Sequence, residues 1–247
     1  MPDKSIPNMK KRVLTALAVM IACIATAQEN TDYPGALQIS ALNDKALLQR
    51  IASSEKPSVG TAEYEALMQE ISDKSLTAVR RDHNLPLKKF EKSAFLAFNA
   101  NENTKYIADR LSEKGVDVFL FPEGTPNEDF YNIRYKLNDY NKIVVCYHAG
   151  DSLCADKTRR AKTKPDILQF KMYASLGVRH GNIGVYFGDP TDLDAFDRDL
   201  RDFDVLIVGY EDTQYNCKAA AKIILGEIKP EGVLPVETKH FKKGTSR

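Results

Sequence analysis

Six polar side chains follow closely after four short apolar stretches of this sequence. They are Glu123, His148, Asp151, Asp189, Tyr210 and Glu211. Carboxylates beside a histidine can transfer protons as general acids and bases. The same carboxylate and phenol oxygens can instead hydrogen-bond the hydroxyl groups of a sugar. Either chemistry requires the side chains to lie at one place, so the elements that carry them must bring them together.

Some of these residue types also have a structural role. Aspartate and glutamate are favoured in the positively polarised first turn of a helix, so we expect helix capping from Asp189 and Asp212. His148 is less easily explained as a cap, and both a structural and a catalytic role stay open for it. Glu123 and Glu211 are the best candidates for a functional carboxylate. Asp151, Asp189 and Tyr210 are candidate ligand contacts.

Short apolar stretches alternate with amphipathic stretches along the chain. The predicted strands are 93–99, 116–121, 142–147, 183–187 and 204–209, and the predicted helices are 61–80, 103–114, 127–139, 166–176, 193–200 and 215–225. This alternation is typical of a parallel sheet with helices on both faces. We therefore predict an α/β fold, a three-layer α/β/α sandwich whose doubly wound, mostly parallel sheet has five to six strands. Ligands of such sheets bind beyond the carboxyl ends of the strands.

Composition excludes several classes of protein. The 247 residues carry a formal net charge of +1 and are 43% hydrophobic. This balance argues against a nucleic-acid partner, and the apolar fraction is too high for a disordered chain. The sequence has no phosphate-binding loop, dinucleotide fingerprint or nucleophile elbow. It also has no cysteine or histidine spacing typical of a metal site, so we expect no cofactor and no metal.

The first 27 residues have the three parts of a secretory signal peptide. Basic residues 10–12 precede the apolar run 13–24, and Ala25-Thr26-Ala27 fits a cleavage site. Cleavage near Ala27 removes a net charge of +3 and leaves the remaining chain at −2. We expect a periplasmic or secreted protein with no membrane span after cleavage. An uncleaved membrane anchor and a lipoprotein at Cys23 are the alternatives.

The rest of the chain divides into a leader or linker (28–60), one folded domain (61–240) and a basic tail (241–247). Thr61 is the expected N-cap of the first long helix. Three cysteines remain after cleavage, so a complete disulfide framework is excluded. Cys146 and Cys154 could pair in an oxidising compartment. The preferred interpretation is that Cys146, inside an apolar run, is a buried small hydrophobe.

Several segments together resemble the C-terminal α/β sandwich domain of glycoside hydrolase family 3. They are 203–211 (FDVLIVGYE), 219–222 (AAAK), 225–236 (LGEIKPEGVLPV), 71–87 and 187–193 (FGDPTDL). The resemblance covers roughly residues 61–240. Within it, Gly226 is expected to end a helix, and Gly232 is expected to supply a turn that most residues cannot adopt. Cys217 stands where a polar glutamine is common in the family.

This resemblance implies the hydrolysis of β-linked O-glycosyl bonds and a carbohydrate ligand. Members carry their nucleophilic aspartate on a TIM barrel that precedes the sandwich domain. The residues before 61 are too few for a barrel of about 250 residues, so we expect catalysis to need a separate barrel, which could be encoded by another gene. The alternatives are a non-catalytic carbohydrate- or protein-binding module and a remnant without function.

Overall fold

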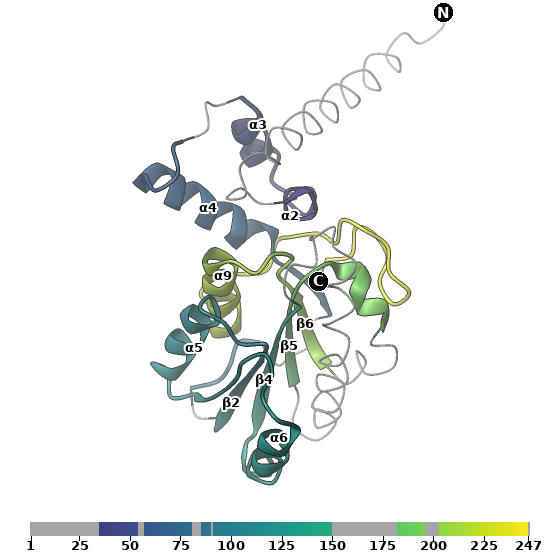
Figure 1. Cartoon of the computed structure of the whole chain (residues 1–247). Coiled ribbons are helices and arrows are strands. Elements are labelled where there is room, and N and C mark those ends of the chain that lie inside the picture. The colour runs from purple at the N-terminus through teal and green to yellow at the C-terminus, as the bar shows by residue number, and fades with distance from the viewer. Residues whose placement is uncertain are drawn as a thin grey trace, which may run out of the picture.

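The computed structural model describes residues 35–53, 57–80, 85–89, 91–149, 182–195 and 203–246. Its strands form one sheet in the order β1-β6-β5-β4-β2-β3 (Figure 1). These strands are β1 (Thr77–Arg80), β2 (Ser93–Phe98), β3 (Asp117–Phe121), β4 (Lys142–His148), β5 (Asn182–Phe187) and β6 (Phe203–Val208). All neighbouring pairs are parallel except β1 and β6, which are antiparallel. The predicted mostly parallel α/β sheet is confirmed.

Helices account for most of the other described elements. They are α2 (Ala36–Ser40), α3 (Lys45–Ser53), α4 (Ala62–Ser75), α5 (Thr104–Ser112), α6 (Asn127–Arg134), α9 (Gln214–Leu225) and the 3₁₀ helices η1 (Lys136–Asp139) and η3 (Pro190–Ala195). The predicted helix 166–176 lies outside the described residues. Among the residues described, no helix is long and apolar enough to cross a membrane.

Three predicted helices differ in extent from those observed. The stretch 61–80 is helical only to Ser75, because the chain extends at Leu76 (ψ 130°) and continues as β1. The stretch 127–139 divides into α6 and η1, and the described part of 193–200 belongs to η3. The expected ends are confirmed at two places. The Thr61 hydroxyl accepts the Tyr64 N–H at 3.2 Å, and Gly226 ends α9 with a left-handed φ of 75°.

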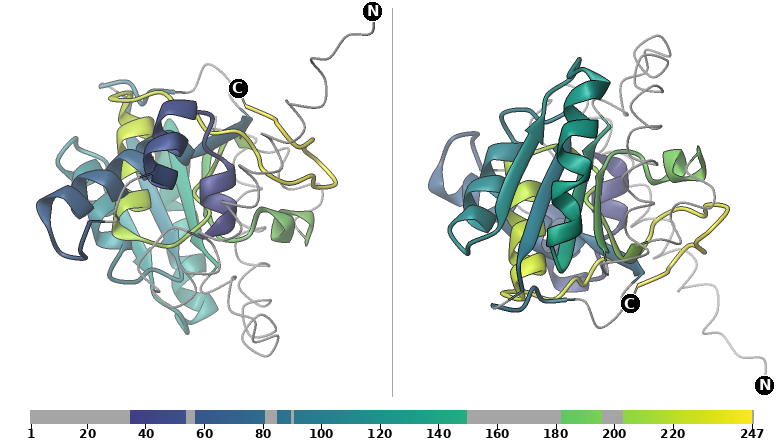
Figure 2. Two further views of the ribbon diagram at one scale, coloured as in Figure 1. Left: turned by 90° about the horizontal axis from the view of Figure 1, so that it is seen from above. Right: turned by 90° about the horizontal axis from the view of Figure 1, so that it is seen from below.

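The two faces of the sheet carry separate hydrophobic layers because successive strand residues point to opposite sides. On one face, Val144 and Cys146 of β4 pack with residues of α5 and α9. On the other face, Val145 and Tyr147 pack with Phe130 of α6 and with η1. Figure 2 shows α6 and α9 on opposite sides of the strands. The burial of Cys146 predicted from its apolar run is confirmed.

Part of the stretch predicted as a leader or linker belongs to the folded body. Leu42 and Leu47, at the end of α2 and in α3, pack against Ile71 of α4. Gln38 of α2 is buried and exchanges two hydrogen bonds with Asn216 of α9, at 2.8 and 3.0 Å. Residues 35–53 therefore pack on the sandwich and are part of its folded body.

The segment after α9 returns to the start of β1. The Gly232 N–H donates to the Leu76 carbonyl at 3.2 Å. A Cβ at Gly232 would lie 1.9 Å from the Ser75 carbonyl oxygen, whereas the backbone of Gly232 is outside the left-handed region. The expected reason for this glycine was therefore wrong. The residue is needed for the close approach of two backbone segments, not for a turn of unusual φ.

Candidate functional site

A buried histidine lies at the carboxyl end of the central strand β4. His148 is the last residue of that strand, one position beyond the predicted end, and it is 0% exposed. It shares a face with Cys146, two residues earlier, and this face is covered by α5 and α9. The imidazole stacks on the Phe187 ring of β5, with 4.9 Å between the ring centroids. The strand pleat therefore points His148 into the interior.

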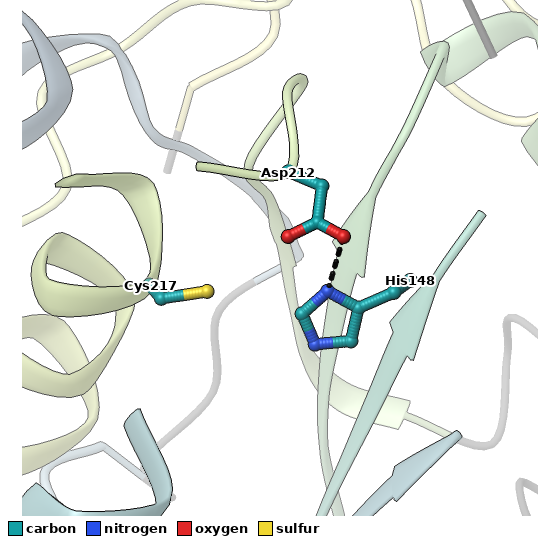
Figure 3. Close-up of side chains that lie close together, drawn as sticks. All are labelled: His148, Asp212 and Cys217. Atoms are coloured by element: carbon teal, nitrogen blue, oxygen red, sulfur yellow. Dashed lines mark ion pairs between the residues drawn. The ribbon is translucent and has the colours of Figure 1, made fainter. Parts of the chain in front are cut away.

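Asp212, in the loop between β6 and α9, faces this histidine. Its Oδ2 lies 3.0 Å from His148 Nδ1, which is an ion-pair distance (Figure 3). The Nδ1 atom makes no hydrogen bond that meets ordinary geometry, so its contact with the carboxylate is an ion pair. Asp212 Oδ2 also accepts a hydrogen bond from the Asn101 side-chain amide. The carboxylate is thus held from two sides inside the fold.

The capping role expected of Asp212 was wrong. Thr213 is the N-cap of α9, and its hydroxyl accepts the Asn216 N–H at 3.2 Å. Thr213 takes this position because it has the extended backbone that an N-cap requires. Asp212 is one residue earlier, so its side chain is free to turn toward β4.

The other imidazole nitrogen contacts the first turn of α5. His148 Nε2 lies 3.0 Å from the Thr104 hydroxyl and 3.4 Å from Cys146 Sγ. Thr104 is positioned by Asn101, whose side-chain oxygen accepts the Thr104 N–H at 3.2 Å. The first residue of α5 and the loop before it therefore hold both members of the pair, the histidine through Thr104 and the aspartate through Asn101.

The surroundings favour the charged form of both members of this pair. Burial by itself lowers the pKa of His148, but the Cys146 sulfur and the Asp212 carboxylate outweigh it and raise that pKa to about 10. Burial raises the pKa of Asp212, but the contact with His148 outweighs it and holds that pKa below its usual value. Nearby Cys217 is different, because burial raises its thiol pKa well above the ordinary value. These directions favour an imidazolium beside a carboxylate at neutral pH.

The other candidates from the sequence do not join this cluster. Glu211 is next to Asp212, but its carboxylate accepts the Gly35 N–H. Asp189 accepts the N–H and the hydroxyl of Thr191, at 2.9 and 2.7 Å, and so closes the turn that begins η3. Its expected capping role fits this geometry.

Two further candidates lie elsewhere, and one cannot be placed. Tyr210 is 2% exposed, its hydroxyl contacts Thr77 Oγ1 at 2.6 Å, and burial raises its pKa. Glu123 is exposed in the turn after the edge strand β3. Asp151 lies outside the described residues, as does Cys154. Of the candidates that the structure describes, His148 is the one that lies in the cluster.

The described cluster is closed to an external substrate. His148 is fully buried, and the side chain of Asp212 is 12% exposed. A surface hollow of about 650 Å³ is lined by Asn43–Ala46 and Glu231, none of which belongs to the cluster. The arrangement is suited to holding charge or a small ion inside the domain. It does not present an acid or a base to a sugar.

Comparisons with known proteins identify the fold. No protein-family model matches the sequence, and no curated protein does. A family 3 β-N-acetylglucosaminidase from Paenibacillus sp. str. FPU-7 matches 77% of this chain and 37% of its own, with a TM-score of 0.53 and 19% identity. A Listeria innocua β-glucosidase matches 75% of this chain and 29% of its own, with a TM-score of 0.57 and 14% identity. A fungal multi-domain β-N-acetylglucosaminidase of family 3 matches 81% of this chain and 24% of its own, with a TM-score of 0.54 and 17% identity.

The chain therefore has the α/β sandwich fold found in the C-terminal region of glycoside hydrolase family 3 enzymes. This confirms the resemblance inferred from its motifs. At 14–19% identity the likeness is one of fold. The part that matches amounts to between 24 and 37% of the length of these larger proteins.

Proposed function

We propose that this chain supplies a family 3-type sandwich domain for the hydrolysis of β-linked O-glycosyl compounds, with the catalytic barrel supplied separately. The fold shared with family 3 enzymes is the observation that carries this proposal. The matched region is about a third or less of most of those enzymes, so the larger part of each lies outside the match. The domain would then act by docking beside a barrel.

The partners of the described carboxylates support the proposal that the catalytic groups come from another protein. Retaining glycoside hydrolysis needs two carboxyl groups about 5 Å apart that flank the sugar. Asp212 is paired with a buried histidine, Glu211 with the Gly35 backbone and Asp189 with Thr191. Within the described strand ends, these three carboxylates have structural partners rather than a shared open site.

An activity assay with aryl β-glycosides tests this proposal. The purified full chain is expected to show no turnover alone and to gain turnover when mixed with a TIM-barrel protein encoded by a neighbouring gene. Glu63→Gln removes an exposed carboxylate in the first turn of α4 and serves as a control that should leave the mixed activity unchanged. Turnover by the full chain alone would contradict the need for a barrel.

The second candidate is a non-catalytic module that binds carbohydrate. Two tyrosines favour it, since Tyr131 of α6 is 52% exposed and Tyr135 at the end of α6 is 81% exposed. Tyrosine rings can stack on the apolar faces of sugars while their hydroxyls stay wet. Glycan-dependent thermal stabilisation that is lost in Tyr135→Ala and kept in Tyr106→Ala, with no turnover in any mixture, would favour the binding module.

We also propose that the protein is exported to the periplasm or secreted. The three-part pattern of residues 1–27 supports this, and those residues lie outside the described part of the structure. Export would place the sandwich domain where extracellular glycans are found.

A further inference from the structure

We propose that His148, Asp212 and Cys217 form a buried binding site for a divalent transition-metal ion of the zinc type. Their ligand atoms, the imidazole nitrogen, a carboxylate oxygen and the thiol sulfur, all lie within 4.8 Å of one another. The three residues come from β4, from the loop after β6 and from α9, and Figure 3 shows the Cys217 sulfur directed toward the His148–Asp212 pair. One ion could therefore bridge three elements of the fold.

Two atoms of this cluster lack hydrogen-bond partners. His148 Nδ1 and Asp212 Oδ1 are buried and make no hydrogen bond, although Nδ1 lies 3.0 Å from Asp212 Oδ2. Buried polar atoms are nearly always paired in folded proteins, so each such exception calls for an explanation. A metal ion between the three side chains would bind both atoms at once. His148 is 0% exposed, so bulk water does not reach the unpartnered Nδ1.

The combination of ligands selects the class of metal. Nitrogen, oxygen and sulfur donors together suit zinc or cobalt, whereas calcium and magnesium require oxygen ligands. Zinc ligands lie about 2.0 to 2.3 Å from the ion, so neighbouring ligand atoms are roughly 3 to 4 Å apart. The ligand atoms of His148, Asp212 and Cys217 lie within 4.8 Å of one another, somewhat wider than that spacing. Small side-chain rotations would bring the Cys217 sulfur to the spacing of zinc ligands.

Charge balance also fits a divalent ion. A doubly charged cation with the Asp212 carboxylate, a Cys217 thiolate and a neutral His148 has no net charge, which is the state that a buried site tolerates best. Binding would release the thiol proton of Cys217 and the Nδ1 proton of His148 to solvent. Metal affinity should therefore fall as the pH is lowered.

The contacts around the ligands are those that an ion site needs. When Nδ1 binds a metal, the imidazole proton is on Nε2, and the Thr104 hydroxyl lies 3.0 Å from Nε2 to accept it. Asn101 donates to Asp212 Oδ2 and so fixes the carboxylate. Such second contacts orient metal ligands in known sites. Cys146 lies 3.4 Å from Nε2, on the other edge of the ring, and is not one of the three clustered ligands.

Cobalt titration of the full chain tests the proposal. Protein stripped with a chelator is expected to develop a thiolate-to-cobalt charge-transfer absorption that saturates at one Co²⁺ per chain. Zn²⁺ should displace the cobalt and raise the melting temperature. Cys217→Ser is expected to abolish the absorption, whereas the matched variant Cys146→Ser should keep it.

The wild-type titration decides the question even if a core variant fails to fold. Absence of the absorption in the folded wild-type chain, monitored by circular dichroism, would overturn the proposal. The same absorption in folded Cys217→Ser, or its loss in folded Cys146→Ser, would overturn the assignment of the ligands. Because no glycoside is present, the outcome is independent of the proposed role in glycan hydrolysis.

Discussion

The pKa shifts of His148 and Asp212 favour opposite charges on two side chains that water scarcely reaches. The exposed fraction of their side chains is 1% and 12%; His148 is contacted by the first residue of α5, and Asp212 by the loop before that helix. A buried charge is tolerated only with a partner, because desolvation disfavours the ionised form of either residue alone. In the metal-free chain the two side chains therefore depend on each other for stability.

Removing one partner should reveal this dependence. In metal-free protein, Asp212→Asn leaves the buried imidazole without its carboxylate, and we expect a loss of about 3 to 5 kcal/mol in the free energy of unfolding. Urea unfolding at pH 7 with a chelator measures this. Asp189→Asn removes a carboxylate that closes a partly exposed turn and should cost no more than about 1 kcal/mol. Equal losses in the two variants would mean that the pair is unimportant for stability.

The stability of the metal-free chain should also depend on pH. Burial by itself lowers the pKa of His148, but Cys146 and Asp212 raise that pKa to about 10 in the folded chain. An unfolded histidine has a pKa near 6.5. The contribution of His148 is therefore complete below about pH 6.5 and is lost as the pH rises toward the folded value.

Urea unfolding at pH 6, 7.5 and 9 tests this dependence. The wild-type free energy of unfolding should fall by up to about 1.4 kcal/mol for each pH unit from this group. His148→Gln should flatten the decline, and His240→Gln, which changes a partly exposed histidine of the C-terminal segment, should not. A wild-type stability that increases from pH 6 to 9 would contradict the assigned direction of the shift.

At the scale of elements, the first turns of α5 and α9 complete the cluster on β4. Thr104 is the first residue of α5, and Asp212 is two residues before α9. In the sheet, β5 separates β4 from β6, and its Phe187 ring packs on His148. The pair thus joins the end of β4 to the loop after β6, although β5 lies between these strands in the sheet. The Phe187 ring of β5 lies against the histidine.

The alternation of apolar and amphipathic stretches was enough to predict the sheet and most of its strands. Each predicted strand is observed to within about two residues because buried parallel strands are short, continuous and apolar. The position of His148 followed from the same pattern. The edge strand β1 was missed because Thr77–Arg80 continues the helical pattern of α4 without a break in composition.

The cluster itself could not be predicted in the same way. Asp212 was assigned to capping because local composition does not distinguish a cap from a residue one position earlier. The ligands His148, Asp212 and Cys217 have no motif spacing, since strand order brings them together. The docking of 35–53 depends on Gln38 and Asn216, a polar contact that hydrophobic periodicity does not report.

Gly232 allows a test of how the C-terminal segment joins β1. In Gly232→Ala the new Cβ would lie 1.9 Å from the Ser75 carbonyl oxygen, so the backbones must separate, at an expected cost of about 2 to 3 kcal/mol in the free energy of unfolding. Gly124→Ala is the control. Gly124 has a φ of 82° and open space around it, so alanine there should cost about 1 kcal/mol. A smaller loss of unfolding free energy in Gly232→Ala than in Gly124→Ala would show that the C-terminal segment can move away from Ser75 at little cost.

At the scale of the whole molecule, the described fold places its charged cluster inside and its exposed aromatics outside. Tyr131 lies in α6 and Tyr135 directly follows it, on the face of the sheet opposite α9 and the buried pair. Changes to the two regions should therefore be independent, since sites without shared contacts have additive effects. Glycan binding and metal binding can be measured separately on the same full chain.

Export is a property of the whole chain and gives the last prediction. Expressed in a Gram-negative host, the full-length protein should be recovered from the osmotic-shock fraction with its N-terminus at Gln28, because signal peptidase cleaves after a small-x-small pattern such as Ala25-Thr26-Ala27. Intact mass and N-terminal sequencing measure this. Ala27→Arg should block cleavage and leave the precursor in the membrane fraction, whereas Gln28→Ala should be processed normally. Recovery of the uncleaved wild-type chain from the cytoplasm would contradict export.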